Sequence, residues 1–155
     1  MTNALPNARL QLLQSQMLTM PPVAAMAISV DRMDEQGLHL LAPLAANVND
    51  KGNAFGGSLA SLLTLSSWSW VSLQLEAAGL EADIYVADSQ LRYRLPVYED
   101  LHAVANVAAD QDVDAFVAML RRRGRGRISM QAKIVLASGG VAAEFDGRFA
   151  AMLRA

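Results

Sequence analysis

The chain has 155 residues, enough for one domain with a substantial core, and we expect a single domain over residues 1–155. Charged residues make up 18% of the chain, below the roughly 25% usual for a soluble domain. The net charge of −2 argues against a globally basic nucleic-acid-binding protein. With no cysteine, the chain has no disulfide framework, no thiolate nucleophile and no zinc–thiolate site.

Metal binding and secretion find no support in the sequence. The two histidines, His39 and His102, are far apart and lack the spacing of a helical metal motif, so we expect no metal site. The N-terminus lacks a basic start followed by an apolar run, so we expect a cytoplasmic location.

The first half of the chain predicts a helix, a hairpin and a second, longer helix. Leucines, Leu5 among them, recur with Met17 on one stripe of the first helix, and Pro21-Pro22 ends it. A polar, glycine-rich loop precedes the long helix, and Gly79 is a suitable residue to end that helix. In chain order, we expect a helix at 5–19, strands at 23–33 and 37–44, a loop at 47–57 and a helix at 58–78.

The second half is dominated by strand patterns. We expect strands at 83–95, 101–109, 127–137 and 141–153, with an acidic connector at 110–114 and a short helix at 115–123. Runs of strands separated by one long helix predict the α+β class, with an antiparallel sheet wrapped on that helix.

No charged residue lies between Lys51 and Glu76, a stretch long enough to span a bilayer. Nearly every turn of it carries a hydroxyl group, however, so we favour a helix buried on most sides over a transmembrane segment. Trp68 and Trp70 lie on this helix and are expected in the core or at a dimer interface, with the shaping of an acyl pocket as the alternative.

The loop before the long helix carries the run Asn49-x-x-Gly52-x-x-Phe55-Gly56-Gly57. This run resembles the Asn-x-x-Gly-x-x-His-Gly-Gly motif of many hotdog-fold thioesterases, with phenylalanine in place of histidine. The resemblance implies a sheet of about six strands around one central helix. It also implies an acyl-thioester hydrolase that acts on acyl-CoA or acyl carrier protein and needs no cofactor.

A second run, residues 87–96, resembles a strand of one subgroup, the thioesterase domains fused behind an N-acetyltransferase domain in some bacteria. That subgroup also shows an apolar residue before Gly-Ser-Leu, here Gly57-Ser58-Leu59, and an arginine-rich entry to the fifth strand, here residues 124–127. The resemblance covers Pro6 to Leu153, without an acetyltransferase part.

Gly56 and Gly57 let a ligand approach the backbone at the start of the long helix. The first amides of a helix are unpaired and lie at the positive end of its dipole. The Gly57 N–H can therefore polarise a thioester carbonyl, with Phe55, Gly56 and Ser58 beside the substrate. The alternative is a plain tight turn capped by Ser58.

Asp88 is the main candidate for a general base. Strand alternation places it beside Ile84 and Val86; if that face packs on the long helix, Asp88 lies in a partly dry cleft with a raised pKa. The alternatives are a structural partner for Arg92 or Arg94, or a solvated charge at the edge of the sheet. Many hotdog thioesterases carry an acid on the helix where this chain has Thr64, which can orient water or substrate but is a poor base.

Asn49 can orient water or substrate with its amide, although loop asparagines are more often turn residues. Arg92, Arg125 and Arg127 are candidates to bind substrate, and the arginines between 121 and 127 suit the phosphate of coenzyme A or of a carrier-protein arm. A solvated loop and a nucleic-acid contact are the alternatives for this run, and the second is disfavoured because no aromatic residues are interleaved.

Two functions stay open. The chain is an acyl-thioester hydrolase, or it is a module of the same fold that binds acyl thioesters or assembles without cleaving them. Because so few charges must cover so much apolar surface, we expect a homodimer or a dimer of dimers.

Overall fold

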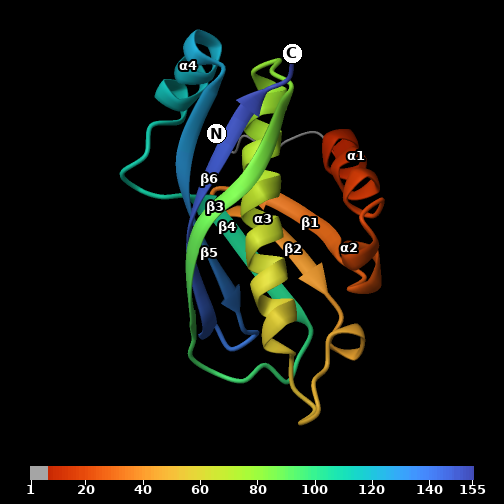
Figure 1. Ribbon diagram of the computed structural model, residues 1–155. Helices are drawn as coiled ribbons and strands as arrows, with labels where there is room; N and C mark the ends of the chain where they lie inside the picture. Colours follow the sequence, from red (N-terminus) through yellow and green to blue (C-terminus); the bar gives the residue numbers. More distant parts are fainter. Residues whose placement is uncertain (1–6) are drawn as a thin grey trace.

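One long helix, α3 (Gly56–Ala77), lies against the concave face of a six-stranded antiparallel sheet in the computed structural model, which describes residues 7–155 (Figure 1). The strands are β1 (Ser29–Asp34), β2 (Gly37–Ala42), β3 (Ala82–Tyr93), β4 (Leu101–Val107), β5 (Arg125–Val135) and β6 (Val141–Leu153). Their order in the sheet is β1-β2-β4-β5-β6-β3. The expected α+β class, with an antiparallel sheet of six strands around a central helix, is confirmed.

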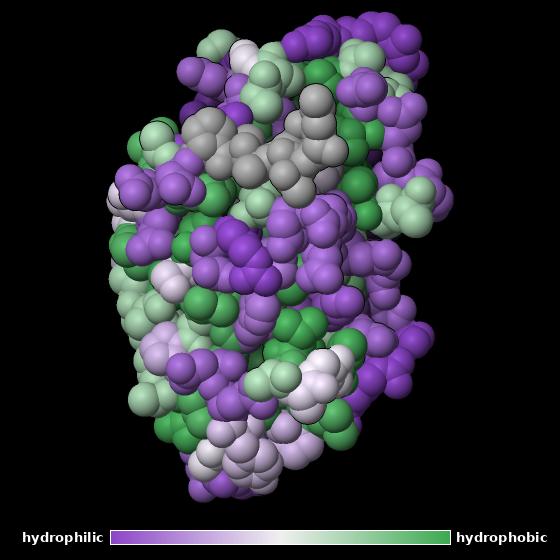
Figure 2. Space-filling view, turned by 180° about the vertical axis from the view of Figure 1, so that it is seen from behind, coloured by the Kyte–Doolittle hydropathy of each residue, from purple (hydrophilic) through white to green (hydrophobic). Residues whose placement is uncertain are grey.

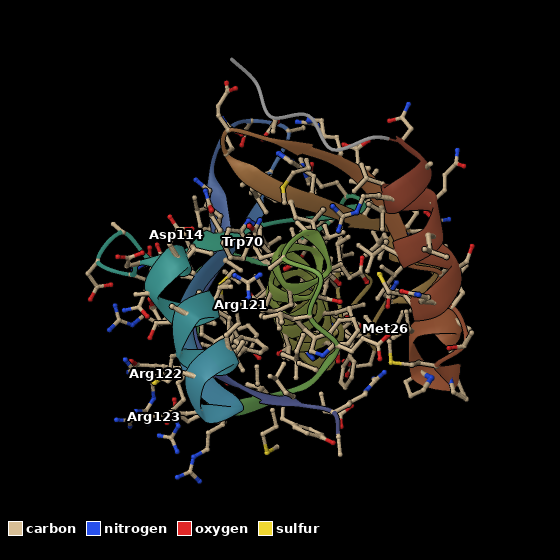
Figure 3. All side chains as sticks on the ribbon, turned by 90° about the horizontal axis from the view of Figure 1, so that it is seen from above. Met26, Trp70, Asp114, Arg121, Arg122 and Arg123 are labelled. Carbon is tan, nitrogen blue, oxygen red and sulfur yellow. The ribbon has the colours of Figure 1, made fainter. Side chains whose placement is uncertain are left out.

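Shorter helices flank this core. They are α1 (Asn7–Met17), α2 (Pro21–Ala25), the 3-10 turn η1 (Leu44–Ala46) and α4 (Val113–Arg123). Seen from above, the sheet curves around α3, with α1 and α2 on one side and α4 on the other (Figure 3).

The uncharged stretch is explained by burial of α3. Leu62 and Leu63 are fully buried, as are the side chains of Ser66 and Ser67. Both serine hydroxyls donate to the carbonyl oxygen of Leu63 at 3.0 Å, which satisfies them inside the core without charge. No helix among residues 7–155 is long and apolar enough to cross a membrane.

Several predicted boundaries need correction. Residues 21–25 form α2 rather than the start of a strand, because Pro21 and Pro22 occupy the first turn of a helix, where proline needs no amide partner. The strand predicted at 23–33 begins only at Ser29. Helix α3 begins two residues before the expected start, and α4 begins at Val113, where the side chain of Asp112 accepts the amide of Ala115 at 3.0 Å. The part of the first helix that was expected at Leu5 and Pro6 lies outside the described residues.

An irregularity in β3 decides which side chains face α3. Val86 pairs with Phe149 of β6, and the next paired residue, Asp88, is opposite Arg148, so Ala87 is an extra residue in the strand. Phe149 is fully buried, whereas Arg148 is exposed. Even-numbered side chains therefore face α3 before Ala87, and odd-numbered ones face it afterwards.

Candidate active site

The loop between η1 and α3 is held by backbone bonds that fix the start of the helix. The amide of Phe55 donates to the carbonyl of Asn47 at 2.7 Å, and the amide of Ala54 donates to that of Val97 at 2.8 Å. Val48 and Ala54 form an isolated antiparallel bridge. These contacts anchor the loop on both sides, so the first turn of α3 is presented in one orientation.

Two amides at this helix start have no acceptor among the described residues. Ser58 and Leu59 already donate to the carbonyl of Phe55, whereas the amides of Gly56 and Gly57 make no bond. Phe55 occupies the N-cap position and its side chain cannot accept a hydrogen bond. The alternative that Ser58 caps a plain turn is wrong, because Ser58 lies within the helix and is buried. The two glycine amides are therefore open to a ligand oxygen.

Aromatic side chains flank these amides. The ring of Phe55 lies so close to Gly57 that a β-carbon there would collide with it, whereas a β-carbon at Gly56 would lie 3.8 Å from the ring of Tyr93. The Tyr93 hydroxyl donates to the carbonyl of Gly56 at 3.4 Å. Phe55 and Tyr93 are 56% and 57% exposed, so both rings border the amides from the solvent side.

Tyr93 is a site residue that sequence reasoning missed. The alternation used for Asp88 places odd-numbered residues of β3 away from α3, and the extra residue at Ala87 reverses that assignment. Only the register of β3 against β6 reveals the change. The one feature of the sequence that pointed to Tyr93 is its position within the run at 87–96.

An apolar groove of about 460 Å³ runs beside α3 and the first half of β3. Thr64 lines it and lies seven residues after Gly57, about 10 Å along the helix and on the same side. The Thr64 hydroxyl donates to the carbonyl of Ala60 at 2.8 Å, which leaves its lone pairs as acceptors. Trp68 borders the groove and donates its indole N–H to the carbonyl of Ile84 at 3.0 Å, whereas Trp70 is buried in the core.

Asp88 lies on the opposite face of the sheet from α3. Arg148 donates through Nε to both of its carboxylate oxygens at 3.0 Å, and the pair is about half exposed. The hydrogen bonds from Arg148 lower the pKa of Asp88, and its charge adds to this effect. The prediction of a partly dry cleft and a raised pKa for Asp88 is therefore wrong. The physical cause is the extra residue at Ala87, which turns the carboxylate outward.

The arginines predicted to bind substrate also lie away from the helix start. Arg92 is exposed and lies opposite Glu144 of β6 in the strand register, on the same outer face as Asp88, whereas the ion pair of Glu144 is with Arg94. Arg125 and Arg127 are exposed at the beginning of β5 and line an outer hollow of about 590 Å³. Because β5 begins directly after α4, this hollow lies beside the end of α3 that is opposite to Gly57 (Figure 1).

Part of the arginine run has a structural role. Arg121 reaches from α4 toward α3 and donates to the carbonyl of Ala78 at 2.7 Å, where a positive charge suits the C-terminal end of the helix dipole. Arg122 and Arg123 point away from α3 (Figure 3). One arginine of the run therefore caps α3.

Asn49 is occupied by its own loop. Its amide nitrogen donates to the Asn53 side chain at 2.7 Å, and its oxygen accepts the amides of Lys51 and Asn53 at 2.8 and 3.2 Å. The prediction that Asn49 orients water or substrate gains no support, because these bonds use its donor and acceptor groups to shape the turn. Asn47, which sequence reasoning missed, donates to two backbone carbonyls and keeps a buried oxygen that has no partner within residues 7–155.

Comparison with known proteins assigns a family to this arrangement. Residues 10–153 match the family described as "Putative thioesterase (yiiD_Cterm)". The chain belongs to this family. Membership of this family and a structural neighbour at 26% identity support hydrolysis of thioesters as the general activity.

Solved structures share the fold over nearly the whole chain. A protein of unknown function from Chlorobaculum tepidum has 25% identity and a TM-score of 0.87, with 96% of this chain and 97% of that one covered. A "putative thioesterase" from Shewanella oneidensis has 26% identity and a TM-score of 0.85, with 95% and 99% covered. A thioesterase from Haemophilus influenzae, at 16% identity and a TM-score of 0.72, covers 93% and 90% and shows the fold alone. The hotdog fold is confirmed.

The geometry of Asp88 leads to a prediction on stability and pH. A carboxylate with a lowered pKa stabilises the folded state above its ordinary pKa of 3.8, and this contribution is lost as the pH falls through the lower value. We expect Asp88→Asn to unfold at a slightly lower temperature than the wild type near neutral pH. The difference should close as the pH falls below 3.8.

Thermal unfolding measured across this pH range checks the prediction. Arg148→Gln and the double variant complete a cycle that isolates the ion pair, and the double variant should be no less stable than either single one. A difference between wild type and Asp88→Asn that stays constant at every pH would contradict it.

Proposed function

We propose that the protein hydrolyses acyl thioesters at the N-terminus of α3, with the thioester carbonyl bound by the amide of Gly57. The observation that carries this proposal is the pair of unpaired amides at Gly56 and Gly57, at the positive end of a 22-residue helix. An amide aimed at a developing oxyanion is the largest single contribution to many acyl-transfer reactions. Water then adds to the carbonyl carbon and the C–S bond breaks. One proton of that water ends on the carrier sulfur, so the products are a carboxylic acid and a free thiol.

The apolar groove is the proposed site for the acyl chain. A thioester whose carbonyl lies at Gly57 can direct its chain along α3 past Thr64 toward Trp68. Phe55 would contact the thioester from the solvent side, at the position where the motif of many hotdog thioesterases has histidine. Thr64 accepts a hydrogen bond from water or substrate in this arrangement, and Asp88 takes no part because it lies on the other face of the sheet.

Acyl-CoA and acyl carrier protein remain the proposed substrates, and the cytoplasm the proposed location. Arg125 and Arg127 are proposed to contact carrier phosphate only if a second copy brings its outer hollow near Gly57, because within one chain the hollow lies beside the far end of α3. The likeness to the domains fused with an N-acetyltransferase is likewise a proposal, supported by Phe55 and residues 57–59 and 124–127.

A module that binds thioesters without cleaving them is the second candidate. Two observations favour it: Phe55 stands where the motif of many hotdog thioesterases has histidine, and the Asp88 carboxylate is turned away from the glycine amides. Both candidates require the same amides and groove. They differ only in whether water attacks the bound carbonyl.

A panel of acyl-CoAs of varied chain length separates the two candidates. Hydrolysis predicts release of free thiol, measured with a chromogenic disulfide reagent, from at least one chain length. The binding module predicts a rise in the thermal unfolding midpoint with the same compounds and no thiol release, because ligand binding stabilises the native state. If no member of the panel releases thiol or raises the unfolding midpoint, both candidate functions are contradicted.

A pair of substitutions at one position tests the oxyanion site. Gly57→Pro removes the N–H within the first helical turn, where proline is tolerated, and Gly57→Ala adds a β-carbon but keeps the N–H. We expect kcat/KM to be lower for the proline variant than for the alanine variant by about 10²–10³-fold, the usual effect of losing one oxyanion donor.

Circular dichroism of both variants checks that α3 is intact, and Asp88→Asn serves as a control that should retain turnover. Equal activities of Gly57→Pro and Gly57→Ala would remove the Gly57 amide from the mechanism.

We also propose that the protein is a homodimer associated through β3. This strand of 12 residues is at the edge of the sheet and pairs only with β6 among the described strands. Tyr85, Val86 and Tyr93 on it are exposed apolar residues. A long, exposed and apolar edge strand favours pairing with another chain, which would extend the sheet across two copies.

Sedimentation equilibrium should give a mass of about twice 16.6 kDa or a multiple of that dimer. Tyr85→Lys, which places a charge on the edge strand, should shift the population toward monomer. Leu12→Lys is the matched control, because Leu12 of α1 is exposed to almost the same extent, 55% against 56%. A monomeric wild type at micromolar concentration would contradict the proposal.

A further inference from the structure

The face of the sheet turned away from α3 carries a cluster of two histidines and two aspartates that the proposed function does not use. His39 is in the middle of β2, between Leu38 and Leu40, which are fully buried toward α3. Its own side chain therefore points to the outer face, yet it is only 1% exposed. This outer face of β1, β2 and β4 is turned to the viewer in Figure 2, where hydrophilic residues surround smaller apolar patches.

Sheet pairing brings the second histidine beside the first. His39 pairs with Val104 of β4, and His102 pairs with Leu41 of β2, so the two imidazoles are diagonal neighbours on one face. Their ring centroids are 5.1 Å apart, and Nδ1 of His39 is 2.8 Å from Nε2 of His102. Sixty-three positions separate these residues in sequence, and only strand pairing unites them.

A carboxylate fixes the orientation of His39. Nε2 of His39 is 2.9 Å from Oδ1 of Asp34. Burial by itself would raise the pKa of Asp34, but hydrogen bonds from His39, Arg32 and the amide of Gln36 lower it to about 2. Asp34 is thus an acceptor only, so His39 donates from Nε2, and in the neutral imidazole the Nδ1 then carries a lone pair aimed at His102.

Asp31 completes the cluster. It lies where the register of β1 shifts between Val30 and Arg32, and this irregularity brings its carboxylate toward the histidines. One oxygen of Asp31, one ring nitrogen of His39 and one of His102 lie within 4.8 Å of one another. Arg32 pairs with both Asp31 and Asp34.

We propose that His39, His102 and Asp31 bind one divalent transition-metal ion of the zinc class on the outer face of the sheet. Two nitrogens on a tetrahedral zinc ion are about 3.3 Å apart, given Zn–N bonds of about 2.05 Å. To reach that distance the histidine nitrogens must separate by about 0.5 Å. Both rings must also turn, because the two nitrogens now face each other along the line between the ring centres and their lone pairs have to converge on the ion. Two imidazoles and one carboxylate leave the fourth position for water.

Metal binding leaves the number of protons on the two histidines unchanged. His39 keeps its proton on Nε2, in its bond to Asp34. His102, which donates from Nε2 to His39 in the free protein, moves that proton to Nδ1 by exchange with solvent, so its ring stays neutral and presents a lone pair to the metal. Arg32 gives up its contact with one oxygen of Asp31 and keeps its contact with Asp34.

Ligand chemistry selects the class of metal. Imidazole and carboxylate donors suit zinc, cobalt, nickel and copper, whereas magnesium and calcium prefer oxygen ligands alone. Asp34 supplies the carboxylate that orients and polarises a metal-binding histidine in many zinc sites. The sequence contains no other histidine and no cysteine, so imidazole coordination can arise only here.

The test uses the chain of 155 residues without an affinity tag, stripped of metal with EDTA. Addition of Co²⁺ should produce visible d–d absorption that saturates at one ion per chain, and Zn²⁺ should abolish it by competition. Zn²⁺ alone should raise the thermal unfolding midpoint, because the ion joins β1, β2 and β4 in the folded state only. Absence of saturable binding of both ions would overturn the proposal.

Single substitutions separate a built site from surface binding. His102→Gln and Asp31→Asn remove ligands, and each should weaken Zn²⁺ binding at least about tenfold, as judged by calorimetric titration. Asp34→Asn, which leaves the ligands in place, should weaken binding by about 10–100-fold through the orientation of His39.

Asp146→Asn is the matched control, because Asp146 is an exposed acid on the same face of the sheet but outside the cluster. It should bind Zn²⁺ like the wild type. Circular dichroism establishes that each variant is folded. Equal affinity of His102→Gln and wild type would show that the histidine pair is structural and that any bound zinc lies elsewhere.

Discussion

The burial of α3 is the constraint on which the rest of the structure depends. A helix whose surface is apolar or hydroxylated on nearly every side must be covered almost all round, and one curved sheet does this with its concave face. Helix α1 covers a further side: Ser69 of α3 contacts the sulfur of Met17 at 3.6 Å, and Arg9 donates to the carbonyl of Leu73 at 3.1 Å. The part of α3 beside β3 stays open, and there the groove begins at Ala60, three residues after Gly57.

The two ends of α3 differ in whether their terminal backbone groups have hydrogen-bond partners. At the C-terminal end, Arg121 donates to the carbonyl of Ala78, so the negative end of the dipole is already paired with a cation. At the N-terminal end, two amides lack a partner among the described residues and no side chain caps them. The protein thus neutralises one end of its longest helix and leaves the other available, which is the electrostatic arrangement that a ligand with a polarisable carbonyl requires.

Local pattern was enough to predict most elements, and long-range pairing explains what it missed. The long helix follows from the uncharged run and the glycines beside it, and the strands follow from alternation and turn residues. Helix α2 was missed because Pro21-Pro22 both ends one helix and begins another. The outward turn of Asp88 depends on the single extra residue at Ala87, which no count within β3 reveals. Tyr93 was missed for the same reason, and the histidine pair because β2 and β4 meet only in the folded sheet.

The sheet separates two kinds of chemistry. On its concave side, the groups near the start of α3 are neutral: backbone amides, a threonine hydroxyl, a tyrosine hydroxyl and aromatic rings. On its outer side lie the ion pairs of Asp88 with Arg148 and of Arg32 with Asp31 and Asp34, together with the histidines. A neutral surface suits the uncharged thioester and the acyl chain, because no ion must be desolvated when they bind. The charged groups on the other side are compatible with the proposed function because a layer of sheet lies between them and the groove. The same layer separates the groove from the proposed metal site.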